Sequence, residues 1–340
     1  MITKRILLAA FSAAVVLVAP RANSQTDLDL PMQSQSAEVK QRVGVTDITI
    51  KYHRPLVNGR KIWGGLVPFG QVWRAGANEN TTIEFSTLVT IEGKPLPSGT
   101  YGLHMIPNAD KWTVIFSKFS QAWGSYTYSQ TEDALRVDVK PLPLGEPEDA
   151  LEYEFENLKA DAVDVTLKWE KTAVPFHVAV NEPETTVAAI KNQLRGRAQY
   201  SWSPLNEAAQ YCLSKKTNLE DALKWADQSI QIEERFENLG TKAELLQAMN
   251  RADEAKKVMD HAMEIATPIQ LYSHARSLQQ QKRGEEAMPI FQALAKRAPQ
   301  DVYGHLSEAR IKSAASDFDG ALAEAKAAQG VAPTDQQKKA

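Results

Sequence analysis

The sequence has a single cysteine, Cys212, among its 340 residues. No disulfide can therefore form within one chain, and stability has to come from a packed core rather than from covalent cross-links. Cys212 stands in a helical pattern beside Tyr211 and Leu213. This setting favours a thiol buried in a helix-packing face over an exposed nucleophile.

Motifs for catalysis and for cofactor binding are also missing. The sequence has no glycine-rich phosphate loop before a helix, no Gly-x-Ser-x-Gly turn and no His-Glu-x-x-His zinc motif. His53, His104 and His177 are widely separated, and a zinc site would need them to converge with a carboxylate such as Glu79 or Glu84. We therefore expect ordinary histidines, no metal and no cofactor, and the sequence does not identify a reaction.

The sequence also lacks an excess of positively charged residues. The formal net charge is −3, and removal of a leader that contains Lys4, Arg5 and Arg21 but no acid lowers it to −6. A chain with this balance lacks the basic footprint of a protein that binds nucleic acid or an anionic membrane. Beyond the leader, no segment approaches the roughly 20 apolar residues that a membrane-spanning helix needs.

Residues 1–24 have the organisation of a signal peptide. A positively charged start precedes an apolar run over residues 6–18, and Ala22 and Ser24 are small residues of the kind that a signal peptidase reads. The apolar run is short for a membrane span, which disfavours an uncleaved anchor, and a buried helix is the other alternative. The sequence has no cysteine near the cleavage point, which argues against a lipid anchor on cysteine. We expect a mature chain that begins near Gln25 and is periplasmic or secreted.

Residues 30–180 have the pattern of a β-rich domain. Short runs such as residues 135–139 and 163–169 alternate apolar and polar side chains, and Gly, Pro, Asn and Asp separate them. Roughly nine such runs, without a long helical period between them, favour antiparallel sheets with one solvated face over a doubly wound α/β fold. We predict an all-β antiparallel domain, arranged as a sandwich or as a jelly-roll-like barrel.

Residues 183–333 change to a helical period and contain a repeat. An acidic residue and an alanine recur with the alanines 33, 32 and 34 residues apart, at Ala222, Ala255, Ala287 and Ala321. Prolines follow the last three of these alanines, at Pro268, Pro299 and Pro333. The period resembles the tetratricopeptide repeat (TPR), in which small residues let two antiparallel helices approach closely. We predict an all-α solenoid of helical hairpins, followed by a polar tail at residues 334–340.

The most unusual segment runs from Arg54 to Ser86 and is rich in glycine. It contains Gly59-Arg60-Lys61-Ile62-Trp63-Gly64 and Val72-Trp73-Arg74-Ala75-Gly76-Ala77-Asn78-Glu79, and Trp123-Gly124-Ser125-Tyr126 follows later in the chain. These motifs resemble a secreted bacterial family known as domain of unknown function 2911 (DUF2911), over about residues 30–180. The resemblance implies export and the extent of the domain. It implies no activity, because none defines the family.

The same segment supplies the candidate ligand-binding residues, which are arginines, tryptophans and short polar side chains. They are Arg54, Arg60, Trp63, Trp73, Arg74, Asn78, Glu79 and Trp123. Flat aromatic faces stack on sugars or peptides, while guanidinium, amide and carboxylate groups form hydrogen bonds of fixed geometry. The alternative, which we favour, is that Arg74 pairs with Glu79 or Glu84 and ties the loop to the sheet, since backbone groups in such a loop lack partners in a ladder.

Two functions from different classes stay open. The first, which we favour, is a non-enzymatic exported binding protein whose repeats present a concave surface to a protein or peptide, and whose β domain binds a small-molecule or carbohydrate ligand. The second is a hydrolase that acts on a cell-envelope or extracellular polymer, with its site in the Arg54–Glu84 loop. Glycoside hydrolysis there would need two carboxyl groups, such as those of Glu79 and Glu84, at about 5–10 Å from each other.

Overall fold

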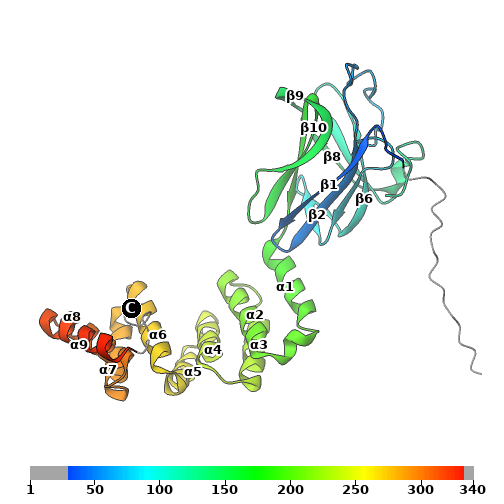
Figure 1. The fold of residues 1–340 in the computed structure, drawn as a ribbon. Coiled ribbons are helices and arrows are strands. Elements are labelled where there is room, and N and C mark those ends of the chain that lie inside the picture. Colours follow the sequence, from blue (N-terminus) through cyan, green and yellow to red (C-terminus); the bar gives the residue numbers. More distant parts are fainter. Residues whose placement is uncertain (1–29, 333–340) are drawn as a thin grey trace, which may run out of the picture.

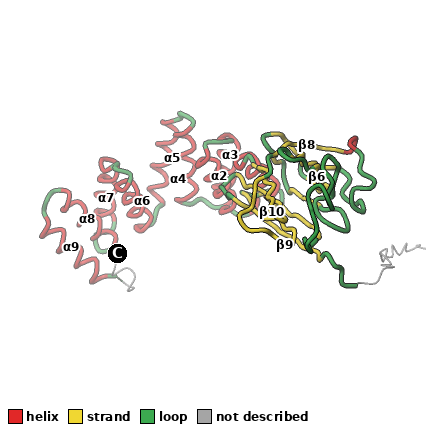
Figure 2. Tube along the Cα trace, turned by 90° about the horizontal axis from the view of Figure 1, so that it is seen from above, coloured by secondary structure: helices red, strands yellow, loops and turns green. Residues whose placement is uncertain are grey.

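The computed structural model of the protein describes residues 30–332. The predicted signal peptide, Pro333 and the polar tail lie outside the described residues. Strands form the first part of the described chain and helices form the second (Figure 1). Figure 2 shows the same division from above, with the strands at one end and the helices extending away from them.

The strands form two antiparallel sheets. They are β1 (Gln35–Val43), β2 (Thr46–Arg54), β3 (Thr82–Phe85), β4 (Val89–Ile91), β5 (Lys94–Leu96), β6 (Gly99–Ile106), β7 (Trp112–Ser117), β8 (Asp133–Val139), β9 (Leu142–Glu156) and β10 (Ala162–Ala179). A short 3₁₀ turn, η1 (Gln130–Glu132), precedes β8. The larger sheet has the order β1-β2-β3-β6-β7-β8, and the smaller has the order β5-β4-β10-β9.

The alternation in the sequence becomes a buried and a solvated face. In β2, Ile48, Ile50 and Tyr52 are buried, whereas Lys51 between them is exposed. Successive side chains of a strand point to opposite faces, so a period of two places all the apolar groups on the core side. The period-two prediction is thus confirmed for this strand.

The two sheets share one hydrophobic core. Ile50 and Phe116 of the larger sheet belong to the same buried cluster as Leu167 and Phe176 of the smaller sheet. The rings of Phe116 and Phe176 meet at a centroid distance of 5.7 Å. The predicted antiparallel β class is confirmed. The sheets are not closed into a barrel, and a jelly-roll arrangement is not confirmed, because each sheet keeps its own edge strands.

The helical part begins directly after β10. Its elements are α1 (Glu182–Gln193), η2 (Arg197–Tyr200), α2 (Trp202–Lys215), α3 (Leu219–Ile232), α4 (Phe236–Ala248), α5 (Ala252–Ile265), α6 (Pro268–Gln280), α7 (Gly284–Arg297), α8 (Val302–Ala314) and α9 (Phe318–Val331). Four consecutive pairs, α2–α3, α4–α5, α6–α7 and α8–α9, pack as hairpins. Within residues 30–332, no helix is both long and apolar enough to cross a membrane.

The repeated alanines occupy the close contacts between helices. Ala222, Ala255 and Ala287 are buried, as the spacing predicted. Ala321 is only partly buried, because its helix, α9, is the last one in the described array and no further hairpin covers it. Cys212 is a buried free thiol on α2, which confirms the structural role predicted for it.

Candidate functional site

The connection between β2 and β3 carries most of the candidate residues. The loop itself covers residues 55–81, which is shorter than predicted, because Arg54 still belongs to β2 and Glu84 already belongs to β3. β2 reaches Arg54 through its pairing with Gln35 of β1, and β3 begins at Thr82, which pairs with Lys51 of β2. The loop contributes side chains to the core as well as to the surface.

Two loop tryptophans enter one end of the core. Trp63 lies 4.8 Å from Trp112 of β7, and Trp73 stacks on Trp169 of β10 at 5.9 Å with an interplanar angle of 17°. Buried aromatic rings contribute large apolar area, and such pairs add stability beyond area alone. Trp63 and Trp73 therefore anchor the loop between the two sheets.

Hydrogen bonds to buried backbone groups also hold the loop. Trp73 and Met105 of β6 exchange two N–H to carbonyl bonds of 2.8 Å each. The carbonyl of Ala75 accepts bonds from the hydroxyls of Thr81, at 3.2 Å, and of Tyr153, at 2.8 Å. The loop thus has the internal ties that its composition required. They come from backbone and hydroxyl groups.

Arg74 does not pair with Glu79 or Glu84, so the carboxylate pairing favoured from the sequence was wrong. Its Nη1 donates to the backbone carbonyl of Asn78, and its guanidinium lies 5.4 Å over the ring of Tyr126. Within the described part of the chain, Arg74 forms no ion pair. The side chain is half-buried and turned toward the segment that contains Trp123.

The expected carboxylate partners lie elsewhere. Glu79 contacts Nε2 of His53 at 3.3 Å, and Glu84 is exposed on β3, opposite Thr49 of β2. Glu79 thus lies beside His53 and Glu84 beside Thr49, two positions of β2 whose backbones are about 13 Å apart. The register of β2 and β3 decided this placement, and the loop sequence does not contain that information.

The other two arginines bind backbone carbonyls. Arg54 donates from Nε to Leu151 at 2.9 Å and forms an ion pair with Glu152 at 2.9 Å, so it ties β2 to β9. Arg60 donates from Nε to Val57 at 3.1 Å within its own turn. Arg54 is therefore a structural tie, whereas the exposed Arg60 keeps part of its guanidinium open to solvent.

A hollow of about 340 Å³, the loop hollow, lies beside this segment. It is lined by Gln33, Ser34, Pro55, Leu56, Asn58, Arg60, Leu66, Val67, Trp73, Arg74, Gly76, Ala77, Asn78, Trp123 and Trp169. Five candidates, Arg60, Trp73, Arg74, Asn78 and Trp123, are brought together there. The remaining candidates, Arg54, Trp63 and Glu79, are not among the lining residues.

Sequence reasoning missed Trp169 and Asn58 as lining residues. Trp169 ends an alternating run, which indicates a core position, and it is in fact 1% exposed. It lines the hollow beside Trp73, on which its ring stacks. Asn58, which has a positive φ of 48°, lies in a turn and had no signal beyond its neighbouring glycine.

His104 lies beneath the segment that closes the hollow. Its side chain on β6 is 2% exposed, and its Nδ1 lies 2.8 Å from the hydroxyl of Ser125. Burial lowers the pKa of His104 to about 4; the charge of Asp133 opposes this shift, and that of Arg74 adds to it. His104 is therefore neutral at pH 7.

The three histidines of the first half do not converge. His53 contacts Glu79, His104 contacts Ser125, and Nδ1 of His177 lies 2.6 Å from Asp164. Across residues 30–332, no group of three or more histidine, cysteine or acidic residues is arranged to hold a metal ion.

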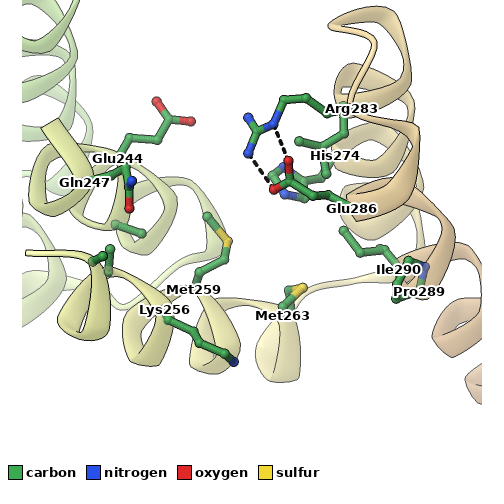
Figure 3. A pocket seen from close by; sticks show the side chains of 14 residues that line it. Glu244, Gln247, Lys256, Met259, Met263, His274, Arg283, Glu286, Pro289 and Ile290 are labelled. Carbon is green, nitrogen blue, oxygen red and sulfur yellow. Dashed lines mark hydrogen bonds and ion pairs between the residues drawn. The ribbon is translucent and has the colours of Figure 1, made fainter.

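A larger hollow, the inter-hairpin cleft, opens between the α4–α5 and α6–α7 hairpins (Figure 3). It has a volume of about 540 Å³. Its lining residues are Ala243, Glu244, Gln247, Ala252, Ala255, Lys256, Met259, Met263, His274, Leu278, Arg283, Glu286, Pro289 and Ile290. Figure 3 shows Glu244 on one wall facing Arg283 and Glu286 on the other, with the two methionines between the walls.

The cleft lies between two buried clusters of the array. One cluster spans α1 to α5, and the other spans Ala266, α6 and α7, with Phe236 of α4 and Met263 of α5 packed against it. The hairpins remain joined to one side, where Gln270 donates to Glu237 at 2.8 Å and Arg297 donates to the carbonyl of Ala266 at 2.8 Å. The stack is thus connected at one edge and open at the other.

Glu244 is the uncompensated charge of the cleft. Arg283 forms two hydrogen bonds of 2.7 Å with Glu286, and Lys256 pairs with Asp260 at 2.6 Å. Among the described residues Glu244 has no ion pair. Its side chain is exposed, and partial desolvation by the cleft walls raises its pKa, an effect that Arg283 partly offsets.

The structure thus defines a two-part protein, with an antiparallel sheet domain that carries a polar and aromatic hollow and a row of helical hairpins that carries a cleft. Residues 34–178 match the family model of DUF2911, a protein of unknown function. The resemblance to DUF2911 that the loop motifs indicated is confirmed over residues 34–178.

Comparison with solved structures finds TPR-type proteins for the helices. The crystal structure of MamA is 11% identical with a TM-score of 0.28, and the match covers 43% of this chain and 86% of MamA. The crystal structure of YrrB, a TPR protein with an unusual peptide-binding site, is 14% identical with a TM-score of 0.26, covering 47% of this chain and 82% of YrrB. No curated protein matches the chain. The assignment of hairpin repeats rests on the helix pairs themselves.

Proposed function

We propose that this is an exported binding protein whose helical half takes a peptide segment of a partner protein in the inter-hairpin cleft. The observation that carries the proposal is the gap in the stack, where two hairpins that would normally bury each other's apolar faces leave a concave space instead. Met259 and Met263 lie between its walls. Methionine is flexible and polarizable, and it is common on surfaces that accept peptides.

The charge of the cleft indicates the chemistry of the peptide. A carboxylate in a partly dehydrated site is stabilised by a cation that arrives with the partner, since the local dielectric is lower than that of water. Glu244 therefore favours a lysine or arginine, and the Met259 and Leu278 side chains favour an apolar neighbour on the same peptide.

Neutralising Glu244 tests this proposal. We expect Glu244→Gln to weaken binding of a labelled leucine–lysine peptide about tenfold, the effect of losing one charge-assisted hydrogen bond. Fluorescence anisotropy with the mature protein measures the affinity. The matched control is Glu285→Gln, which removes an exposed carboxylate of α7 that does not line the cleft. Binding of a leucine–glutamate peptide equal to that of the leucine–lysine peptide would refute the proposal.

Export is the second part of the proposal, and the order of charge, apolar run and small residues in the leader supports it. We expect the protein recovered outside the cytoplasm to begin near Gln25. Intact mass spectrometry checks this, since loss of residues 1–24 changes the mass by a known amount. Accumulation of the full-length chain in the cytoplasm would contradict it.

We also propose residues 30–180 and 183–333 as the two domains, with a sandwich as the finer description of the first. The end of β10 at Ala179, the start of α1 at Glu182 and the core shared by the two sheets support this division. The hydrolase alternative has less support, because Glu79 contacts His53 whereas Glu84 lies opposite Thr49, four residues away on β2, so the two are not arranged as a pair.

A further inference from the structure

The loop hollow is positively charged. Its lining includes the guanidinium groups of Arg60 and Arg74 and contains no aspartate or glutamate. Neither arginine forms an ion pair within residues 30–332, whereas Arg235, Arg251 and Arg283 of the helical half each pair with a glutamate. A half-buried guanidinium without a carboxylate carries an unmet charge, and an anion is the group that meets it with paired hydrogen bonds.

The guanidinium of Arg74 is held in one orientation. Gly124, which has a φ of +70°, lets the group lie directly against the backbone, since a Cβ at that position would be 2.7 Å from Cζ of Arg74. The ring of Tyr126 lies on the guanidinium, and the carbonyl of Asn78 accepts a bond from Nη1. Because the side chain is already ordered, binding an anion costs little additional conformational entropy.

Flat apolar faces and amides adjoin the charge. Trp123 is 59% exposed at the rim, and Trp73 is backed by Trp169, so its ring is rigid. The C–H faces of a sugar ring stack on such surfaces. Asn58 and Gln33, both exposed at the hollow, supply amide donors and acceptors that suit hydroxyl groups.

We propose that the loop hollow binds an acidic sugar, with its carboxylate or phosphate group on Arg74 and Arg60 and its ring against Trp123 and Trp73. This site lies on the DUF2911 domain and is independent of the peptide cleft in the helices, so either proposal can fail without the other. The aromatic faces supply affinity for the ring, and the fixed guanidinium supplies selectivity for the anion.

Isothermal titration calorimetry on the mature protein tests the proposal with three probes that share a pyranose ring. The probes are glucuronate, glucose 6-phosphate and neutral glucose. We expect saturable binding of at least one acidic sugar, with glucose at least tenfold weaker. Comparison of the two anions tells whether a carboxylate or a phosphate is preferred. Adenosine monophosphate serves as a fourth probe, and tighter binding of this nucleotide than of either acidic sugar would overturn the assignment to a sugar.

Substitutions of the lining residues then test whether the sugar binds in the loop hollow. Arg74→Ala should weaken binding of the acidic sugar at least tenfold, and Arg74→Lys should recover part of it, since lysine keeps the charge but loses the planar fork. Trp123→Ala should also weaken binding, and because this side chain is exposed, the variant keeps its fold. The control is Arg42→Ala, an exposed arginine of β1 that pairs with Asp47 and does not line the hollow. Absence of saturable binding at millimolar acidic sugar, or unchanged affinity in both Arg74→Ala and Trp123→Ala, would overturn the proposal.

Discussion

Replacing Trp169 by alanine should lower the free energy of unfolding of the sheet domain by about 3–5 kcal/mol, as for other buried tryptophans. Trp169 is 1% exposed on β10, and its ring contacts both Trp63 and Trp73 of the loop. Its removal leaves a cavity between the sheets and also withdraws the surface on which the loop is anchored. We therefore expect the loss to lie at the upper end of that range.

Trp123→Ala is the matched control for that change. The two residues are of the same type and line the same hollow, but Trp123 is 59% exposed, so its removal should change stability by less than about 0.5 kcal/mol. Hydrogen exchange of β10 amides in increasing denaturant, measured on the mature chain, reports the sheet domain separately from the helices. Equal losses in the two variants would contradict the packing role assigned to Trp169.

Acid should destabilise the sheet domain through His104. The pKa of this side chain falls from 6.5 to about 4 on folding, mainly because burial disfavours the charged imidazolium. The unfolded chain then binds the additional proton first, so stability is complete above pH 6.5 and decreases as the pH falls toward 4. The full decrease is about 3 kcal/mol, from the free energy of one pKa unit.

His104→Asn isolates this contribution. Asparagine can accept a hydrogen bond from Ser125 in place of Nδ1, but it does not titrate. The decrease in stability between pH 6.5 and 4, followed by the same exchange measurement, should be about 3 kcal/mol smaller in the variant. Other acid-sensitive pairs, such as His177 with Asp164, are present in both proteins and cancel in the difference. Identical pH profiles would show that His104 is protonated without cost in the folded state.

The strands and helices of this protein were predicted well from short sequence patterns, because the interactions that form them join residues close together in the chain. The alternation around Ile48 and Ile50 predicted a strand with one buried face, and a strand places every second side chain on one side wherever it lies. The spacing of Ala222, Ala255 and Ala287 predicted hairpins with close helix contacts. These statements concern neighbours along the chain or along one repeat.

The loop motifs predicted a family and a set of residues, but not their partners. Arg74 was expected to pair with Glu79 or Glu84. In the structure Glu79 contacts His53 of β2, and the guanidinium of Arg74 lies over the ring of Tyr126. The error arose because proximity in sequence says little about contacts once a chain reverses direction. The pairing of β2 with β3, and the contact of Gly124 with Arg74, join residues that are far apart in the sequence.

By itself, the sequence determined the order of the parts that the structure describes: antiparallel strands, then helical hairpins of about 33 residues. Tertiary structure decided where the surface is hollow. Arg60, Trp123 and Trp169 come from three distant segments and line one hollow only because the sheets share a core. The inter-hairpin cleft exists because the α4–α5 and α6–α7 hairpins do not close on each other, a property of packing between repeats. Secondary structure follows from periodicity within a segment, whereas a site requires that separate segments converge, and only the folded chain brings them together.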